Sequence, residues 1–121
     1  MLALSPSVPI YLHCEPIDMR KSFDGLYGII KNDFQRDVRD GGLFMFLNQR
    51  RNRIKLLYWD TDGIAIWMKR LERGCFQRPV RSVDSKHVFI SPAELQWILT
   101  GIELESVRKR KRYVAPKSLA S

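Results

Sequence analysis

The chain has 121 residues, 45% of them hydrophobic and 28% charged, and it carries 21 Lys and Arg against 13 Asp and Glu, a net charge of +8. This composition excludes a disordered chain, and the length suits one domain that buries roughly two-thirds of the surface its unfolded chain exposes. The sequence has two cysteines, no signal-peptide pattern and no apolar run near the ~20 residues that span a bilayer. It therefore predicts a soluble, cytoplasmic protein with neither a membrane span nor a disulfide framework.

The basic excess is unevenly distributed along the chain. Residues 1–40 carry five cations and six carboxylates, residues 41–81 carry nine and three, and residues 82–121 carry seven and four. Such clustering predicts a polyanionic partner, either nucleic acid or an acidic protein surface. The alternative interpretation is a solvated surface that keeps the protein in solution.

An amphipathic helix is predicted in the first third of the chain. Residues 1–9 are rich in Ser and Pro and form an expected flexible lead-in, while residues 10–14 have the pattern of a short strand. Asp18 is the expected N-cap of a helix that ends near Phe34. The apolar face of this helix follows the helical period through Met19, Phe23, Leu26, Tyr27, Ile30 and Phe34.

Three apolar segments after Gly41-Gly42 predict an antiparallel β-meander. They are residues 43–47, 54–59 and 64–68. A wide basic loop at residues 48–53 joins the first two, and a tight turn at residues 60–63 joins the last two, with Gly63 available for a positive φ. The expected fold class is therefore α+β, an antiparallel β-meander packed by the N-terminal amphipathic helix.

A short C-terminal helix is predicted after a possible strand at residues 87–90. Ser91 as N-cap, Pro92 at the first helical position and Glu94 form a capping box. The apolar face and the C-terminal stop are expected at Leu95, Ile98, Leu99 and Gly101. Residues 10–107 are the expected single domain, and residues 108–121 are an expected mobile basic tail.

Alternation along the second and third strands of the meander predicts two different sheet faces. One is aliphatic and suits the core beneath the N-terminal helix, with Ile54, Leu56, Tyr58, Ile64, Ile66 and Met68. The other carries Lys55, Leu57, Trp59, Ala65, Trp67 and Lys69. This second face is either a cation-rimmed aromatic surface for bases and phosphates or a layer covered by the C-terminal helix, and the sequence leaves both open.

Cations beside the meander and in the tail are the predicted contacts to nucleic acid, because guanidinium and ammonium groups bind phosphate oxygens. They are Arg50, Arg51, Arg53, Lys55, Lys69, Arg70, Arg73, Arg108, Lys109, Arg110, Lys111 and Arg112, and Arg78 continues the charge after the meander. No helix carries the recognition face of a helix-turn-helix protein, so base-specific recognition is not predicted.

Catalytic and metal-binding alternatives have weaker support. Asp18, Asp24, Asp60, Asp62 and Glu72 are a possible carboxylate set for metal-dependent phosphoryl transfer. Simpler explanations are a helix cap for Asp18, the polar face of the helix for Asp24 and a hairpin turn for Asp60 and Asp62. His13, Cys14, Cys75 and His87 lack the usual spacing of zinc ligands. Because nucleotide-binding and nucleophile motifs are also missing, no catalytic residue, metal site or cofactor is predicted.

Several motifs resemble one family of mobile-element proteins. They are DMRKSFDGL (18–26), LFMF (43–46), RRNRIKLLYWDTDG (50–63), IWMKRLERGCF (66–76) and SPAELQWILTGIE (91–103). Together they resemble the TnpB, or Orf2-like, accessory proteins of insertion sequence 66-type elements, over about residues 10–102. The resemblance implies a bacterial protein that assists DNA transposition beside a separate transposase, in a family without established catalytic residues.

Two functional hypotheses follow from the residues and the resemblance. The first is a non-catalytic accessory factor that binds DNA, including the ends of the element, through the predicted cations. The second is an adaptor that docks on the transposase of the same element with Trp59 and Trp67 as anchors. A metal-dependent nuclease ranks last, and the oligomeric state, the DNA sequence and the transposition step stay open.

Overall fold

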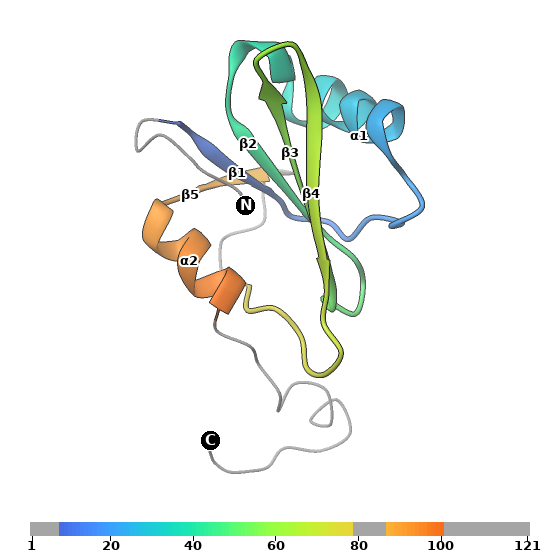
Figure 1. Ribbon diagram of the computed structural model, residues 1–121, viewed down its shortest axis with the longest axis vertical. Coiled ribbons are helices and arrows are strands. Elements are labelled where there is room, and N and C mark those ends of the chain that lie inside the picture. The colour runs from blue at the N-terminus through green and yellow to red at the C-terminus, as the bar shows by residue number, and fades with distance from the viewer. Residues whose placement is uncertain (1–7, 79–86, 101–121) are drawn as a thin grey trace.

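The structure, a computed structural model, describes residues 8–78 and 87–100 and places a five-stranded sheet between two helical segments (Figure 1). The strand order is β4-β3-β2-β1-β5. The elements are β1 (Ile10–His13), α1 (Phe23–Ile29), a π-helix (Ile30–Phe34), a 3-10 helix (Val38–Asp40), β2 (Leu43–Leu47), β3 (Arg53–Asp60), β4 (Gly63–Arg70), β5 (His87–Ile90) and α2 (Pro92–Thr100).

The predicted α+β fold and its meander are confirmed, because β2, β3 and β4 pair as successive antiparallel neighbours. β1 pairs in parallel with β2, with Ile10 opposite Leu43, and α1 lies in the crossover that such a parallel connection needs. β5 pairs antiparallel with β1 and forms the other edge of the sheet. The sheet is thus mixed, and the meander makes up three of its five strands.

The tight turn between β3 and β4 is also confirmed, but the residue with a positive φ differs from the predicted one. Asp60 pairs with Gly63, which leaves Thr61 and Asp62 as a two-residue loop. Thr61 has a φ of 55°, whereas Gly63 lies in β4 with an ordinary negative φ. The first loop position of the favoured hairpin turns requires the left-handed conformation, so Thr61 adopts it and the glycine does not.

The first helix begins at Phe23, later than the predicted start at Asp18. Asp18 does not cap the helix, because its carboxylate accepts hydrogen bonds from the backbone N–H of Arg20 at 2.9 Å and from the Arg20 guanidinium at 2.6 Å. The side-chain bond from Arg20 lowers the pKa of Asp18 to about 2. The helical segment ends at Phe34 as predicted, although its last turn is a π-helix.

Each face of the sheet has its own buried core, and a different helix covers each one. α1 and the π-helix pack on the face that presents Phe44 and Leu57, which we call the α1 face. α2 packs on the opposite face, which presents Met45 and Leu56 and which we call the α2 face. Phe44 and Met45 are neighbours in β2, and Leu56 and Leu57 are neighbours in β3. Because successive side chains of a strand point to opposite faces, each strand contributes to both cores.

The strand register corrects the predicted division of side chains between the faces. Because Asp60 pairs with Gly63, residues 55, 57 and 59 of β3 lie on the α1 face together with residues 64, 66 and 68 of β4. The predicted face that combined Lys55 and Trp59 with Trp67 and Lys69 is therefore wrong, and so is the aliphatic face predicted to lie beneath the N-terminal helix. The alternation within each strand was correct, but the side on which the two strands match depends on the turn.

The capping box of α2 is confirmed. The Ser91 N–H donates to Glu94 Oε1 at 2.9 Å, and the Glu94 N–H donates to Ser91 Oγ at 3.1 Å. Leu95 and Ile98 are buried on the α2 face as predicted. The predicted stop at Gly101 and the tail lie outside the described residues.

Two further observations concern the ends of the described chain and the membrane. Val8 packs against the core of the α2 face, and the Leu43 N–H donates to the Pro9 carbonyl at 2.9 Å, so residues 8 and 9 are part of the fold rather than of a flexible lead-in. No helix within residues 8–78 and 87–100 has the length and apolar character that crossing a bilayer requires.

Candidate nucleic-acid interface

One end of the sheet gathers seven cations from two segments, the β2–β3 loop and the residues around and after the end of β4 (lower part of Figure 1). The segments touch through their backbones, because the Leu71 N–H donates to the Asn52 carbonyl at 2.8 Å and the Phe76 N–H donates to the Arg51 carbonyl at 2.7 Å. The basic end, as we call it, consists of Arg50, Arg51, Arg53, Lys69, Arg70, Arg73 and Arg78. Residues 48–53 and 69–78 contain one carboxylate beside these seven cations.

Most of this charge is not neutralised within the described residues. Arg50, Arg53, Lys69 and Arg73 have no described carboxylate within ion-pair distance, in contrast to Arg20, which lies 2.6 Å from Asp18. Arg70 approaches Glu72 at 3.7 Å, and both side chains are exposed. An exposed pair at this distance contributes little, so Arg70 adds its charge to that of Arg50, Arg53, Lys69 and Arg73.

Arg53 and Arg70 lie directly opposite each other on the α1 face, at the last paired position of β3 and β4. Like charges at opposed positions of an antiparallel pair destabilise the sheet. An anion placed between or beside the two guanidinium groups would remove this repulsion. The register therefore places two like charges side by side, an arrangement that suits an external anion.

Lys55 does not belong to this surface, which corrects its prediction as a phosphate contact. Its side chain is buried, and Nζ donates to the Met19 carbonyl at 2.9 Å and to the Lys21 carbonyl at 2.6 Å. The ammonium group thus holds the loop between β1 and α1 onto the α1 face. Lys55 is therefore a structural residue, although its place in the sequence, close to the basic loop, is that expected of a binding residue.

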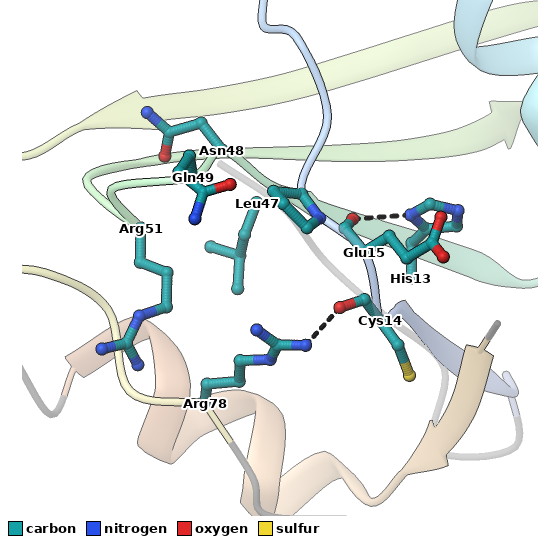
Figure 2. A pocket seen from close by; sticks show the side chains of 9 residues that line it. His13, Cys14, Glu15, Leu47, Asn48, Gln49, Arg51 and Arg78 are labelled. Atoms are coloured by element: carbon teal, nitrogen blue, oxygen red, sulfur yellow. Dashed lines mark hydrogen bonds between the residues drawn. The ribbon is translucent and has the colours of Figure 1, made fainter. Parts of the chain in front are cut away.

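A polar pocket of about 280 Å³ lies beside the basic end (Figure 2). It forms where the C-terminal end of β1 meets the β2–β3 loop and the segment after β4. Its lining residues are His13, Cys14, Glu15, Pro16, Leu47, Asn48, Gln49, Arg51 and Arg78.

In Figure 2 Arg51 lies to the left of the pocket and His13 and Glu15 lie to the right; the Arg78 guanidinium extends toward Cys14, whereas the Arg51 guanidinium points away from it. Arg78 donates to the Cys14 carbonyl, which fixes the position of its guanidinium. A guanidinium has five donors, so this bond leaves others for a ligand. Two such groups in one small polar pocket suit an anion with several acceptor oxygens, such as a phosphate.

The two candidate anchor tryptophans lie on opposite faces of the sheet. Trp59 is on the α1 face and is 36% exposed, whereas Trp67 is half-buried on the α2 face against the core beneath α2. The prediction that they form one surface is therefore wrong. The alternative, that α2 covers the tryptophans, holds for Trp67 but not for Trp59. The predicted contacts Arg108, Lys109, Arg110, Lys111 and Arg112 lie outside the described residues.

The alternative catalytic sets are not brought together. Asp60 and Asp62 lie at the β3–β4 turn, and Glu72 follows β4 at its other end, roughly 26 Å away for an eight-residue strand. His13 Nε2 lies 2.9 Å from Asp33 Oδ2 and its Nδ1 lies 2.8 Å from the Glu15 carbonyl, so both ring nitrogens have protein partners. No group of three or more His, Cys, Asp or Glu in the described part of the chain is arranged to hold a metal ion.

Local sequence patterns do not predict the pocket or the part that Arg78 takes in it. The pocket needs β1 to lie parallel to β2, and it needs the segment after β4 to fold back onto the β2–β3 loop. Both contacts join residues far apart in the chain. The signal available in the sequence is the charge of Arg78, which continues the run of cations after β4.

Comparison with known proteins connects this chain to one family. Residues 8–109 match the model of the family described as IS66 Orf2 like protein. The chain is 29% identical over 120 residues to uncharacterized protein y4jC of Sinorhizobium fredii, covering 99% of this chain and 100% of that protein. It is 31% identical over 103 residues to uncharacterized protein y4hO of the same organism, covering 85% of this chain and 88% of that protein. No solved structure matches the chain.

Proposed function

Because this chain belongs to the IS66 Orf2-like protein family, we propose that it is a non-catalytic accessory factor for transposition that binds DNA through the basic end of its sheet. The observation that supports the proposal best is the convergence of seven cations with one carboxylate in two touching segments. A surface of this kind binds the phosphate backbone and releases its condensed counterions. The element DNA, including its ends, is the proposed partner.

The proposed contacts differ in how they meet the DNA. Arg50, Lys69 and Arg73 are exposed. Their guanidinium and ammonium groups donate hydrogen bonds to successive phosphates along one DNA strand. Arg53 and Arg70 share the position where an anion relieves their mutual repulsion. Arg51 and Arg78 line the pocket, which takes one phosphate group. Since these contacts address the backbone, the binding is expected to depend weakly on DNA sequence.

The β2–β3 loop is an ordered platform for these side chains. The Asn48 side-chain amide donates to Asn52 Oδ1 at 2.8 Å, and the Arg53 N–H donates to Asn48 Oδ1 at 3.0 Å. A loop that is already fixed loses little conformational entropy when its arginines bind, which favours affinity.

The test is the salt dependence of DNA affinity. The logarithm of the association constant should fall linearly with the logarithm of salt concentration, with a slope of about −0.9 per phosphate neutralised. Arg50→Gln, Arg53→Gln and Arg73→Gln should each make the slope shallower by about 0.9, because each removes one phosphate contact. The matched control is Lys31→Gln, which removes an exposed cation from the π-helix, away from the basic end. Equal slopes for the wild type and the triple arginine variant would contradict the proposal.

A second proposal is an adaptor that docks on the transposase of the same element, and the exposure of Trp59 on the α1 face favours it. Exposed tryptophans are frequent anchors of protein interfaces. Trp59→Ala should then abolish capture of the purified transposase in the absence of DNA, whereas Trp67→Phe, on the other face, should not. Capture that survives Trp59→Ala would refute this assignment.

A further inference from the structure

β4 lies at one edge of the described sheet, and β3 is the one described strand that pairs with it. In a hairpin closed by a two-residue turn the closing pair is hydrogen-bonded, so residues 63, 65, 67 and 69 bond to β3. The N–H and C=O groups of Ile64, Ile66, Met68 and Arg70 consequently point outward from the edge. This edge is a template for another strand.

The centre of this edge lacks the usual protection against pairing. Residues 64–68, IAIWM, are apolar, with no charge, proline or glycine. Natural edge strands that avoid partners place lysine, proline or a bulge at such positions. Along β4 and the turn before it, charge appears only at the two ends, where Asp60 and Asp62 lie at the turn and Lys69 and Arg70 lie at the basic end.

We propose that β4 pairs antiparallel with β4 of a second copy of this chain, about a two-fold axis that passes beside Ile66. In this register Ile66 lies opposite Ile66 of the second copy, and Ile64 lies opposite Met68 of the second copy. Asp62 lies opposite Arg70 of the second copy, and the symmetry produces this ion pair twice. The edge is thus complementary to itself, as the interface of a two-fold dimer must be.

The charges select this register from its neighbours. The outward-pointing backbone N–H and C=O groups of the two copies must face each other. A residue of one copy can therefore change its opposed residue only by two positions along the other copy. One such shift places Asp62 opposite Glu72 of the second copy, and the other places Met68 opposite Asp62 of the second copy. In the proposed register Ile64, Ile66 and Met68 face apolar side chains and the charges face opposite charges, whereas each shifted register places a charged side chain opposite an apolar one.

The repulsion between Arg53 and Arg70 gives independent support. These guanidinium groups are opposed on the α1 face, and the partner of Arg70 among the described residues is an exposed carboxylate at 3.7 Å. In the proposed pair Asp62 of the second copy, the turn residue that precedes β4, lies beside Arg70. It supplies the negative charge that this position lacks in the single chain.

The arrangement leaves DNA binding possible, because antiparallel pairing places the two basic ends at opposite ends of the joined sheets. The proposed pairing does not rest on DNA binding. Of the basic end, Arg70 alone lies in the proposed seam. In the dimer Asp62 of the second copy takes the place beside Arg70 that a phosphate would take in the single chain, and the remaining cations of the basic end stay available to DNA.

The first test is the mass of the full chain in solution, measured by sedimentation over a concentration series without DNA. We expect a concentration-dependent dimer in the wild type, and Asp62→Arg and Arg70→Asp should each raise the dissociation constant several-fold or more. The double variant Asp62→Arg/Arg70→Asp restores opposite charges and should recover most of the affinity. A chain that is monomeric at every concentration, or a double variant as weak as the single ones, would overturn the proposal.

A second test reads the register directly and does not depend on stable charge variants. Opposed residues of a hydrogen-bonded antiparallel pair have Cα atoms about 5.5 Å apart, within the range of about 4.4–6.8 Å for disulfides. In a Cys14→Ser background, Ile66→Cys should form a reducible dimer on oxidation. Ile64→Cys is the matched control, because the two copies of residue 64 would lie roughly 13 Å apart along the strands. Equal cross-linking of both variants, or cross-linking of neither, would overturn the proposed register.

Discussion

Replacement of the buried Lys55 by Met measures what its ammonium group contributes to folding. Lys55→Met keeps most of the stem that packs beneath the loop and removes both hydrogen bonds, to the Met19 carbonyl at 2.9 Å and the Lys21 carbonyl at 2.6 Å. A hydrogen bond from a charged donor contributes about 1.5–3 kcal/mol, and part of the sum is offset because the variant no longer buries a charge. We expect the free energy of unfolding to fall by about 2–4 kcal/mol.

Urea denaturation of the purified chain gives this difference, with Lys69→Met as the matched control. Lys69 lies on the neighbouring strand opposite Ile54, but its side chain is exposed and has no described hydrogen-bond partner. The control makes the same chemical change without removing a bond, so its stability should stay within about 0.5 kcal/mol of the wild type. Limited trypsin digestion should also cut Lys55→Met faster after Arg20 and Lys21, because the loop that contains them is released.

Two results would refute this reasoning. If Lys55→Met and Lys69→Met unfold at the same urea concentration with the same slope, the buried bonds contribute nothing net to stability. If Lys55→Met is less stable but its cleavage after Arg20 and Lys21 is unchanged, the loss does not arise from release of the loop.

The remaining predictions address the core, the cap and the pH dependence. Phe44→Ala should lower the free energy of unfolding by about 3–5 kcal/mol in urea denaturation. The reason is that Phe44 is fully buried and stacks on Tyr11 with the ring centroids 5.0 Å apart. A loss near about 1 kcal/mol would contradict its place in the core. Ser91→Ala should cost about 1 kcal/mol by the loss of the capping box, with Ser91→Asn nearer to the wild type, and equal losses in both variants would argue against capping. Burial, and next the charge of Arg36, lower the pKa of His87 below 6.5, so the unfolded chain binds a proton more readily and the free energy of unfolding should decrease as the pH falls below 6.5. Denaturation on both sides of that pH should show a weaker dependence in His87→Gln, and an unchanged dependence would refute this cause.

The elements that sequence patterns predict correctly are those defined by neighbouring residues. The capping box at Ser91 and the three meander strands need only local spacing, and the structure has them where they are expected. The parallel pairing of β1 with β2 needs a contact across the whole first helix, so strand propensity alone identifies β1 without placing it. The delayed start of α1 has a similar cause, because Asp18 bonds to Arg20 instead of capping a helix.

The candidate site follows the same division between local and distant information. Alternation along β3 places Lys55 and Trp59 on one face, but it does not tell whether that face is covered or exposed at a given residue. A loop from before α1 covers Lys55, while Trp59 near the turn stays partly exposed. The arginines of the β2–β3 loop are the more predictable part, since long charged side chains in a short connection rarely find a buried partner.

The backbone contacts at the basic end separate the role of the main chain from that of the side chains. The bonds from Leu71 to Asn52 and from Phe76 to Arg51 join the two segments through peptide groups, whatever side chains the segments carry. Arg50, Arg53 and Arg73 can therefore be exchanged, by mutation or by design, without loosening the scaffold that presents them. The charge of this end of the sheet is thus set by side chains, whereas its shape is set by the main chain.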